Sequence, residues 1–186
     1  MSSDALADAL TALAQFQAPD STLGDTLHRI AEITAEALPA ASFVGMTMLD
    51  DDAKPTTAIF TSHESPEIDA AQYRDGKGPC LDAWRTQRVI RLDEVQHWTG
   101  RYPRFCWACQ RHGVRSTLSL PLVSGDVAHG SLNLYAAGPN LFTPDDETLG
   151  LTLARVAGSA LARHQGAVPA VATDSANNSN SSSSGG

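Results

Sequence analysis

The chain has 186 residues, a hydrophobic content of 42%, a formal net charge of -8 and a sequence pI near 5.0. A chain of this length can bury one good core and is short for two independent domains. Its 13 Lys and Arg residues are scattered, which argues against a nucleic-acid surface, because such surfaces need clustered positive charge. It opens without a basic leader and apolar run, and no segment is apolar over a bilayer-spanning length, so we expect a cytoplasmic protein without membrane contact.

The N-terminal third predicts two helices followed by a hairpin. Apolar residues recur at helical spacing from Leu6 to Phe16 and again from Leu23 to Leu38, on either side of a proline break. The segments 42–49 and 57–62 are short and rich in branched and aromatic residues. With the turn between them, these segments predict two antiparallel strands.

The rest of the chain alternates between helices and strands, although no element is predicted between residues 62 and 79. Pro79 and Pro103 open predicted helices, because the first helical turn tolerates proline, and Gly113 ends the second. Acidic residues after Thr143 complement the dipole of a last helix, expected to end near Gly166. The predicted elements are helices at 80–86, 103–111 and 144–166 and strands at 89–92, 116–123 and 127–136.

This order of elements predicts an α/β (α+β) fold, a three-layer α/β/α sandwich around a central antiparallel sheet. Residues 1–166 are expected to form one domain, with its core at about 20–165 and an additional N-terminal helix. Residues 167–186 are small and polar, so nothing offsets the entropy of ordering them, and we expect a disordered Ser/Asn/Gly tail.

Four motifs in this order resemble the GAF domain family, in the form common in actinobacterial signalling proteins: GKGPCLDAWRTQRVIRLDE, GVRSTLSLPL, GSLNLYA, and Phe142 ahead of Asp146 and Glu147. The resemblance covers roughly residues 20–165. It implies terminal helices on one face of the sheet and, on the other, middle helices that enclose a small-molecule pocket. It also implies a sensory and dimerisation module, acting in signal transduction through a partner chain, more often than an enzyme.

Strand alternation independently separates a greasy face of the sheet from a mixed one. On the strand that begins at Ser116, the leucines point one way and Thr117 and Ser119 the other. On the next strand, Asn133 and Tyr135 likewise oppose leucines. A mixed face roofed by helices suits a cavity with apolar walls and a few placed polar groups.

The ligand-binding residues are expected to line this cavity. Arg104 and Arg115 flank it, and guanidinium groups there suit an anionic ligand, although solvated arginines are the simpler reading. The aromatic residues have a simpler reading too, as core filling. The predicted ligand-binding residues are Tyr73, Cys80, Trp84, Trp98, Phe105, Arg115, Ser119, Asn133 and Tyr135.

Three cysteines, Cys80, Cys106 and Cys109, are an odd number in a reducing compartment, so free thiols are expected. Cys106, Cys109 and His112 are spaced three apart on one predicted helix. Because a helix has 3.6 residues per turn, two steps of three residues turn the His112 side chain away from that of Cys106. No metal site is therefore expected. Buried thiols acting as small hydrophobic groups explain the same residues.

The free methionine-(R)-sulfoxide reductases, single GAF-domain thiol enzymes, are the enzymatic alternative. The resemblance implies that Cys80 and one of Cys106 and Cys109 would stand where these enzymes carry cysteines. Two departures from the reductase pattern count against this alternative. The reductases carry substrate-binding carboxylates on strands where this chain has residues such as Ser116 and Asn133, and this chain lacks their cysteine-bearing insertion. No catalytic residues are expected, and the cofactor is unknown.

A ligand-free dimerisation scaffold is the third hypothesis. The helices at 6–16 and 149–161 have more apolar positions than one buried face of a helix needs. The additional apolar positions suit a helical bundle between two copies of the chain. The expected partners are an unidentified small molecule, a second copy of the chain and a separate signalling protein, with neither nucleic acid nor membrane.

Overall fold

The computed structural model describes residues 7, 9, 11–12, 22–49 and 54–167. The predicted helix at 6–16 lies mostly outside these residues, as does most of the hairpin turn, and the predicted tail lies outside them except for residue 167. The described helices are α2 (Leu23–Ala37), α3 (Glu64–Asp75), α4 (Pro79–Thr86), α5 (Pro103–Arg111) and α6 (Pro144–Ala167), with a 3-10 turn η1 at Val95–Trp98. The strands are β1 (Phe43–Leu49), β2 (Pro55–Phe60), β3 (Ile90–Leu92), β4 (Ser116–Ser124) and β5 (Val127–Ala136).

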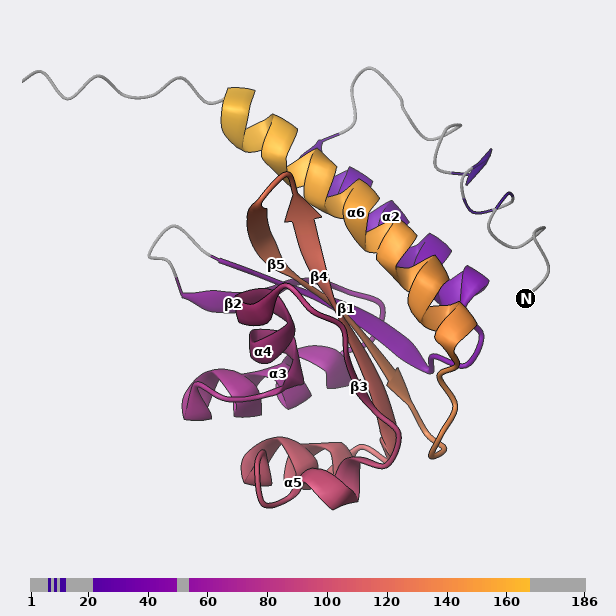
Figure 1. Ribbon diagram of the computed structural model, residues 1–186, viewed down its shortest axis with the longest axis vertical. Coiled ribbons are helices and arrows are strands. Elements are labelled where there is room, and N and C mark those ends of the chain that lie inside the picture. The colour runs from indigo at the N-terminus through magenta and orange to yellow at the C-terminus, as the bar shows by residue number, and fades with distance from the viewer. Residues whose placement is uncertain (1–6, 8, 10, 13–21, 50–53, 168–186) are drawn as a thin grey trace, which may run out of the picture.

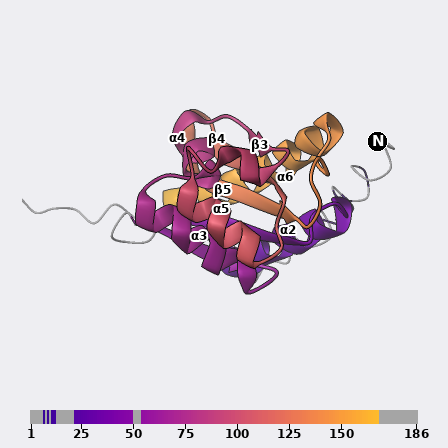
Figure 2. The ribbon, with the colours of Figure 1, turned by 90° about the horizontal axis from the view of Figure 1, so that it is seen from below.

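The five strands form one sheet in the order β2-β1-β5-β4-β3, and every neighbouring pair is antiparallel. Helices α2 and α6 lie side by side on one face, while α3, α4 and α5 cover the other (Figures 1 and 2). The predicted α/β/α sandwich with a central antiparallel sheet is therefore confirmed.

The greasy face of the sheet packs against α2 and α6, as the leucine alternation predicts. Leu118 and Leu120 of β4 and Leu132 and Leu134 of β5 are fully buried there, in one apolar cluster with residues of both helices. Burial of apolar side chains on this scale is the main favourable term in folding. This layer fixes the sheet and leaves its opposite face to α3, α4 and α5.

The start of α6 is anchored by two acidic residues that the sequence assigns to the helix start. The Thr143 amide and hydroxyl both donate to Asp146 Oδ2 at 2.8 Å, and the Asp146 amide donates back to the Thr143 hydroxyl at 3.2 Å. Glu147 accepts from Arg91 Nη1 at 2.7 Å, which joins α6 to the edge strand β3. In the described part of the chain, no helix is long and apolar enough to cross a bilayer.

Helix α3 corrects the sequence-based order of elements, in which nothing was predicted between residues 62 and 79. Its inward face is largely polar, because Ser65, Asp69 and Gln72 are fully buried alongside Ile68 and the nearly buried Ala71. Apolar periodicity is the main sequence signal for a helix, and here polar residues occupy the periodic positions. The omission matters, because α3 supplies the centre of the polar site.

Candidate functional site

The mixed face of the sheet is polar and sealed from solvent. Its polar side chains are each at most 2% exposed: Thr47, Thr117, Ser119, Ser131 and Asn133, with Tyr135 beside them at 1%. Antiparallel pairing sets them next to one another, since Ser119 faces Asn133 and Thr117 faces Tyr135 across β4 and β5. Buried polar groups are costly unless they are hydrogen-bonded, so the partners of this face decide what it can do.

Asp69 of α3 is the centre of the hydrogen bonds above this face. Its carboxylate is fully buried and accepts hydrogen bonds from the Tyr135 hydroxyl, from Gln72 Nε2 at 2.8 Å and from the Thr57 hydroxyl at 2.9 Å. The Ser65 hydroxyl lies 3.5 Å from the same carboxylate. Asp69 therefore connects α3 to strand β2 and to the central strand β5.

The hydrogen bonds continue from Asp69 across the sheet. The Tyr73 hydroxyl lies 2.7 Å from that of Thr57 and 2.9 Å from that of Thr47. Asn133 Nδ2 donates to the Thr47 hydroxyl at 3.0 Å. We refer to the connected side chains as the Asp69 network: Asp69, Tyr135, Gln72, Ser65, Thr57, Tyr73, Thr47 and Asn133.

Two glycines allow α3 to approach this closely. A Cβ atom on Gly45 of β1 would lie 2.0 Å from the Ser65 hydroxyl, and one on Gly78 would lie 2.0 Å from Gln72 Oε1. That same Gln72 oxygen accepts the Cys80 amide at 3.0 Å. The glycine before Pro79 in the GKGPC motif thus lets the first turn of α4 attach to the Asp69 network.

Burial controls the ionisation of this site. Removal from water raises the pKa of Asp69 from 3.8 to about 6, although the hydrogen bonds from Tyr135, Thr57, Gln72 and Ser65 oppose the change. Burial and the nearby Asp69 also raise the pKa of both Tyr73 and Tyr135. The phenols therefore stay neutral near pH 7, and Asp69 is the group that titrates.

Three oxygen atoms of the buried polar face have no hydrogen-bond partner among the described residues. They are Thr117 Oγ1, Ser131 Oγ and Asn133 Oδ1, all on β4 and β5. Helix α4 packs over these two strands. A buried polar atom without a partner costs about 1–3 kcal/mol, so each calls for an explanation.

Five of the predicted ligand-binding residues meet in this region. Tyr73, Asn133 and Tyr135 belong to the Asp69 network, Cys80 is attached to it through Gln72, and Ser119 pairs with Asn133 across the strands. The alternation of the strands locates Ser119, Asn133 and Tyr135 correctly on one face. Whether they contact a ligand stays a prediction.

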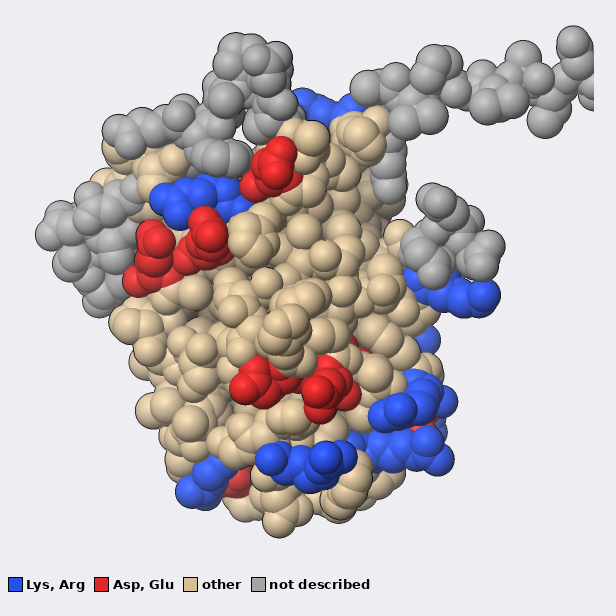
Figure 3. Space-filling view, turned by 180° about the vertical axis from the view of Figure 1, so that it is seen from behind, with Lys and Arg blue, Asp and Glu red and all other residues tan. Residues whose placement is uncertain are grey.

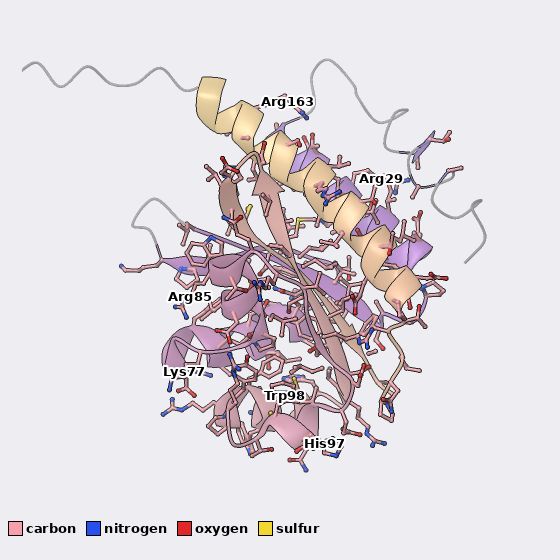
Figure 4. The ribbon with its side chains drawn as sticks, in the orientation of Figure 1. Arg29, Lys77, Arg85, His97, Trp98 and Arg163 are labelled. Carbon is pink, nitrogen blue, oxygen red and sulfur yellow. The ribbon has the colours of Figure 1, made fainter. Side chains whose placement is uncertain are left out.

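The other predicted residues lie around this region. Trp84 donates from Nε1 to the Ala128 carbonyl at 3.0 Å, so its indole is turned toward the first residues of β5. Phe105 is 1% exposed in the apolar cluster beneath α5, where core filling accounts for it. Trp98 stacks on Tyr102, with ring centroids 6.0 Å apart, near α5 at the lower end of the molecule (Figure 4).

The two arginines expected to clamp an anion do not face one another. Arg115 pairs with Glu94 and has 55% of its side chain exposed. Arg104 Nε lies 2.9 Å from Asp75 Oδ1, on the outer side of α5, and its side chain is 63% exposed. Each arginine is thus a solvated ion pair of its own.

The hollows on the surface of the described residues include ones with volumes of about 440, 420 and 290 Å³. The first lies between the β4–β5 turn and α6, near Gln87 and Arg155. The second includes Trp98, beside Arg91 and Glu94, and the third lies between α3 and α5. None of these hollows is lined by a residue of the Asp69 network.

The three cysteines are free thiols that are each at most 1% exposed. Burial raises the pKa of Cys80, Cys106 and Cys109. Cys106 donates to the Val95 carbonyl at 3.1 Å. In the described part of the chain, no three His, Cys, Asp or Glu side chains are grouped so that they could hold a metal ion.

Sequence reasoning missed five members of the Asp69 network: Asp69, Gln72, Ser65, Thr47 and Thr57. A usable signal does exist on α3. Ser65, Asp69 and Gln72 recur at helical spacing, so they share one face with Ile68 in a segment that the structure assigns to α3. A polar stripe in register with an apolar residue indicates a buried polar face.

Comparisons with known proteins support the fold described above. The GAF domain family model matches residues 20–162. Among curated proteins there is no significant match to this sequence.

Three solved structures illustrate the similarity. The GAF domain of an Acinetobacter phosphoenolpyruvate-protein phosphotransferase is 15% identical with a TM-score of 0.66, over 88% of this chain and 94% of that one. The free methionine-R-sulfoxide reductase of Neisseria meningitidis, in complex with its substrate, is 20% identical with a TM-score of 0.66, over 90% and 96%. A domain of a putative two-component sensor histidine kinase from Sinorhizobium meliloti is 14% identical with a TM-score of 0.64, over 78% and 94%.

These identities are low, so the solved structures establish the fold alone. They include a sensor kinase domain and an enzyme, and one fold can host unrelated functions. The match of the family model to most of the sequence is the stronger finding. The chain belongs to the GAF domain family.

Proposed function

We propose that this GAF domain is a small-molecule-binding sensory module that regulates a partner chain in signal transduction. The observation that carries the proposal is the set of unpartnered buried oxygens on β4 and β5, at Thr117, Ser131 and Asn133. Such atoms destabilise a protein, and their cost is offset when a bound molecule supplies the missing hydrogen bonds. They lie on the sheet face that the GAF resemblance assigns to ligand binding.

The proposed ligand is a small polar molecule that carries N–H or O–H groups. Asn133 Nδ2 already donates to Thr47, which leaves its Oδ1 as an acceptor only. The hydroxyls of Thr117 and Ser131 can donate or accept. Entry of the ligand requires movement of α4, the short helix over β4 and β5, which is followed by Gln87 in a left-handed conformation at φ 54°.

A sensor also needs two states with different ligand affinity. Movement of α4 would be transmitted to the Asp69 network, because Gln72 holds both the Cys80 amide and the Asp69 carboxylate. Ligand entry would thereby alter α3 as well as α4. We infer that these two helices carry the signal to the partner chain.

We infer a binding module rather than a thiol enzyme. A catalytic thiol acts as a thiolate, and reactive cysteines have a lowered pKa and partial exposure. Burial has the opposite effect here, since it raises the pKa of Cys80, Cys106 and Cys109. The similarity to a sulfoxide reductase is a similarity of fold.

We also propose that the module works as a homodimer. Apolar residues of α6 that are only partly buried, Leu151 and Val156, lie beside the fully buried ones and offer surface to a second copy. The expected result is a dimer mass by light scattering at micromolar concentration. A monomer mass there would contradict the dimer and would also remove the scaffold hypothesis.

Thr117→Val is expected to stabilise the ligand-free protein by about 1 kcal/mol and to weaken ligand binding. Valine has nearly the same shape as threonine, so the change removes an unpartnered buried hydroxyl and leaves no cavity. The measurements are urea unfolding, and thermal shift with a panel of amino acids, nucleosides and small sugars. At least one compound should raise the melting temperature of the wild type and raise that of Thr117→Val less.

Thr34→Val is the matched control. Thr34 is also fully buried, but its hydroxyl donates to the Ile30 carbonyl at 2.7 Å, on the opposite side of the sheet. This substitution loses a hydrogen bond, so it should not stabilise the protein, and it should leave the response to the panel unchanged. The proposed function fails if no compound shifts the wild type, or if Thr117→Val and the wild type respond equally.

A further inference from the structure

We propose that the groove between α3 and α5 is a docking site for an acidic segment of a partner protein. The groove has a volume of about 290 Å³. Its floor is apolar, at Ala70, Ala71 and Ala108, and its rim carries Arg74, Arg104, Arg111 and Trp107. Figure 3 shows basic side chains gathered at this lower end of the molecule, beneath acidic ones.

Trp107 is the first reason to expect a partner here. It is 59% exposed, whereas Phe105 and Cys106 next to it on α5 are each 1% exposed. The Arg111 guanidinium lies over its ring, 4.9 Å from the centroid, which holds the indole beside the groove. Exposed Trp and Arg side chains around an apolar floor are typical of residues that dominate the energy of protein interfaces.

The charges of the rim are the second reason. The groove is lined by three arginines and one glutamate, in a chain whose formal net charge is -8. Arg104 is paired with Asp75, but the Arg74 side chain makes no ion pair or hydrogen bond to another described residue, and the Arg111 guanidinium lies over the Trp107 ring without an ion pair to a described residue. Two guanidinium groups are thus free to bind carboxylates, which they can do through paired hydrogen bonds.

Other occupants fit these observations less well. In a symmetric dimer through this groove, the same arginines would approach one another, so like charges disfavour a second copy. A nucleic-acid strand would meet Glu67 and Asp75 beside the arginines, and the overall charge repels phosphate. An acidic peptide with one apolar side chain matches both the guanidinium groups and the alanine floor.

The groove is formed by the outer sides of helices whose inner sides cover the buried site. On α3, Asp69 faces inward while the adjacent Ala70 lines the groove. On α5, Cys109 faces inward while Trp107 and Arg111 face outward. The docking site itself does not depend on ligand binding, so its test is independent of the proposed function.

The test starts from peptides rather than from an unknown partner. A phage-displayed library of random peptides of about 12 residues is panned against the full chain, and enriched peptides are synthesised and measured by fluorescence anisotropy. The enriched peptides should be net negative with an apolar residue. Their affinity should fall about tenfold or more in Trp107→Ala and in the double variant Arg74→Glu/Arg111→Glu, and should fall with added salt.

Arg88→Glu is the matched control, because Arg88 is an exposed arginine on another part of the surface, with no hydrogen bond or ion pair to another described residue. It should change the peptide affinity by less than about twofold. A peptide whose Glu residues are replaced by Lys should regain affinity for the double variant and lose it for the wild type. Circular dichroism of each variant verifies that the surface substitutions leave the fold intact.

Several outcomes would overturn the docking site. One is that the enriched peptides show no excess of acidic residues. Another is that the double variant binds these peptides as tightly as the wild type does, and a third is that the peptide with Lys in place of Glu fails to bind the double variant. Stronger binding of a single-stranded oligonucleotide than of the peptides, lost in the double variant, would assign the groove to nucleic acid. A dimer that dissociates in the double variant would assign it to a second copy.

Discussion

The wild-type protein is expected to lose about 2 kcal/mol of unfolding free energy relative to Asp69→Asn as the pH rises from about 4 to about 8. Burial raises the pKa of Asp69 from 3.8 to about 6, so between these values the folded state binds the proton more tightly than the unfolded state does. This stabilisation is complete below the unfolded pKa and is lost as the pH rises through about 6. An asparagine stays neutral, so Asp69→Asn lacks this component.

The measurement is urea unfolding of both proteins at several pH values between about 4 and 8. The neighbouring groups do not interfere, because burial raises the pKa of Tyr73, Tyr135 and Cys80 and keeps all three neutral. Asparagine can also keep the site paired, since its Oδ1 can accept from Tyr135 and Gln72 and its amide can donate to the Thr57 hydroxyl.

Tyr135→Phe provides a second, directional check. The Tyr135 hydroxyl gives the largest of the hydrogen-bond contributions that lower the pKa of Asp69. Its removal should move the loss of stability to higher pH while keeping the same direction. Parallel pH profiles for the wild type and Asp69→Asn, or a shift to lower pH in Tyr135→Phe, would contradict the assignment.

The sheet and the helices from α4 onward could be predicted because their signals are local. Leucine alternation on β4 and β5 gave both the strands and the face that packs on α2 and α6. Pro79 and Pro103 marked helix starts, and the structure places both prolines at the first positions of their helices. Such signals depend on neighbouring residues alone.

Helix α3 could not be found in the same way, because tertiary contacts make its polar face an inner one. Besides Gln72 of the same helix, Tyr135 and Thr57, which are distant in sequence, donate hydrogen bonds to the buried Asp69 carboxylate. Thr57 in turn lies near Tyr73, so a hydroxyl that looks like an ordinary strand residue serves the buried site. The site was therefore recognised only at Tyr73, Asn133 and Tyr135, where a large or distinctive side chain marked it.

The directions of single side chains near loops were also beyond the sequence. Trp84 was expected in the cavity, but its indole bonds the Ala128 carbonyl at the far end of β5. Arg115 directly precedes β4, where strand alternation does not yet fix its direction, and Glu94 holds it at the outer edge. Both positions depend on partners that are remote in the sequence.

The thiols of the native protein are expected to react with a disulfide reagent such as DTNB at least about 10³-fold more slowly than those of the unfolded protein. Cys80, Cys106 and Cys109 are each at most 1% exposed, so the reagent reaches them only when the structure opens. Burial also raises the pKa of each thiol, which lowers the fraction of reactive thiolate. The measurement is the rate of thiol release with and without urea.

Trp107→Cys is the positive control, because this position is 59% exposed on the same helix as Cys106 and Cys109. The introduced thiol should react rapidly and in a ratio of one per chain, while the three native thiols stay protected. Rapid reaction of a native thiol in the folded protein would mean that an accessible thiolate exists. The binding-module proposal would then give way to the reductase alternative, and turnover of free methionine sulfoxide would become the decisive assay, because a buried neutral thiol cannot attack a sulfoxide and an exposed thiolate can.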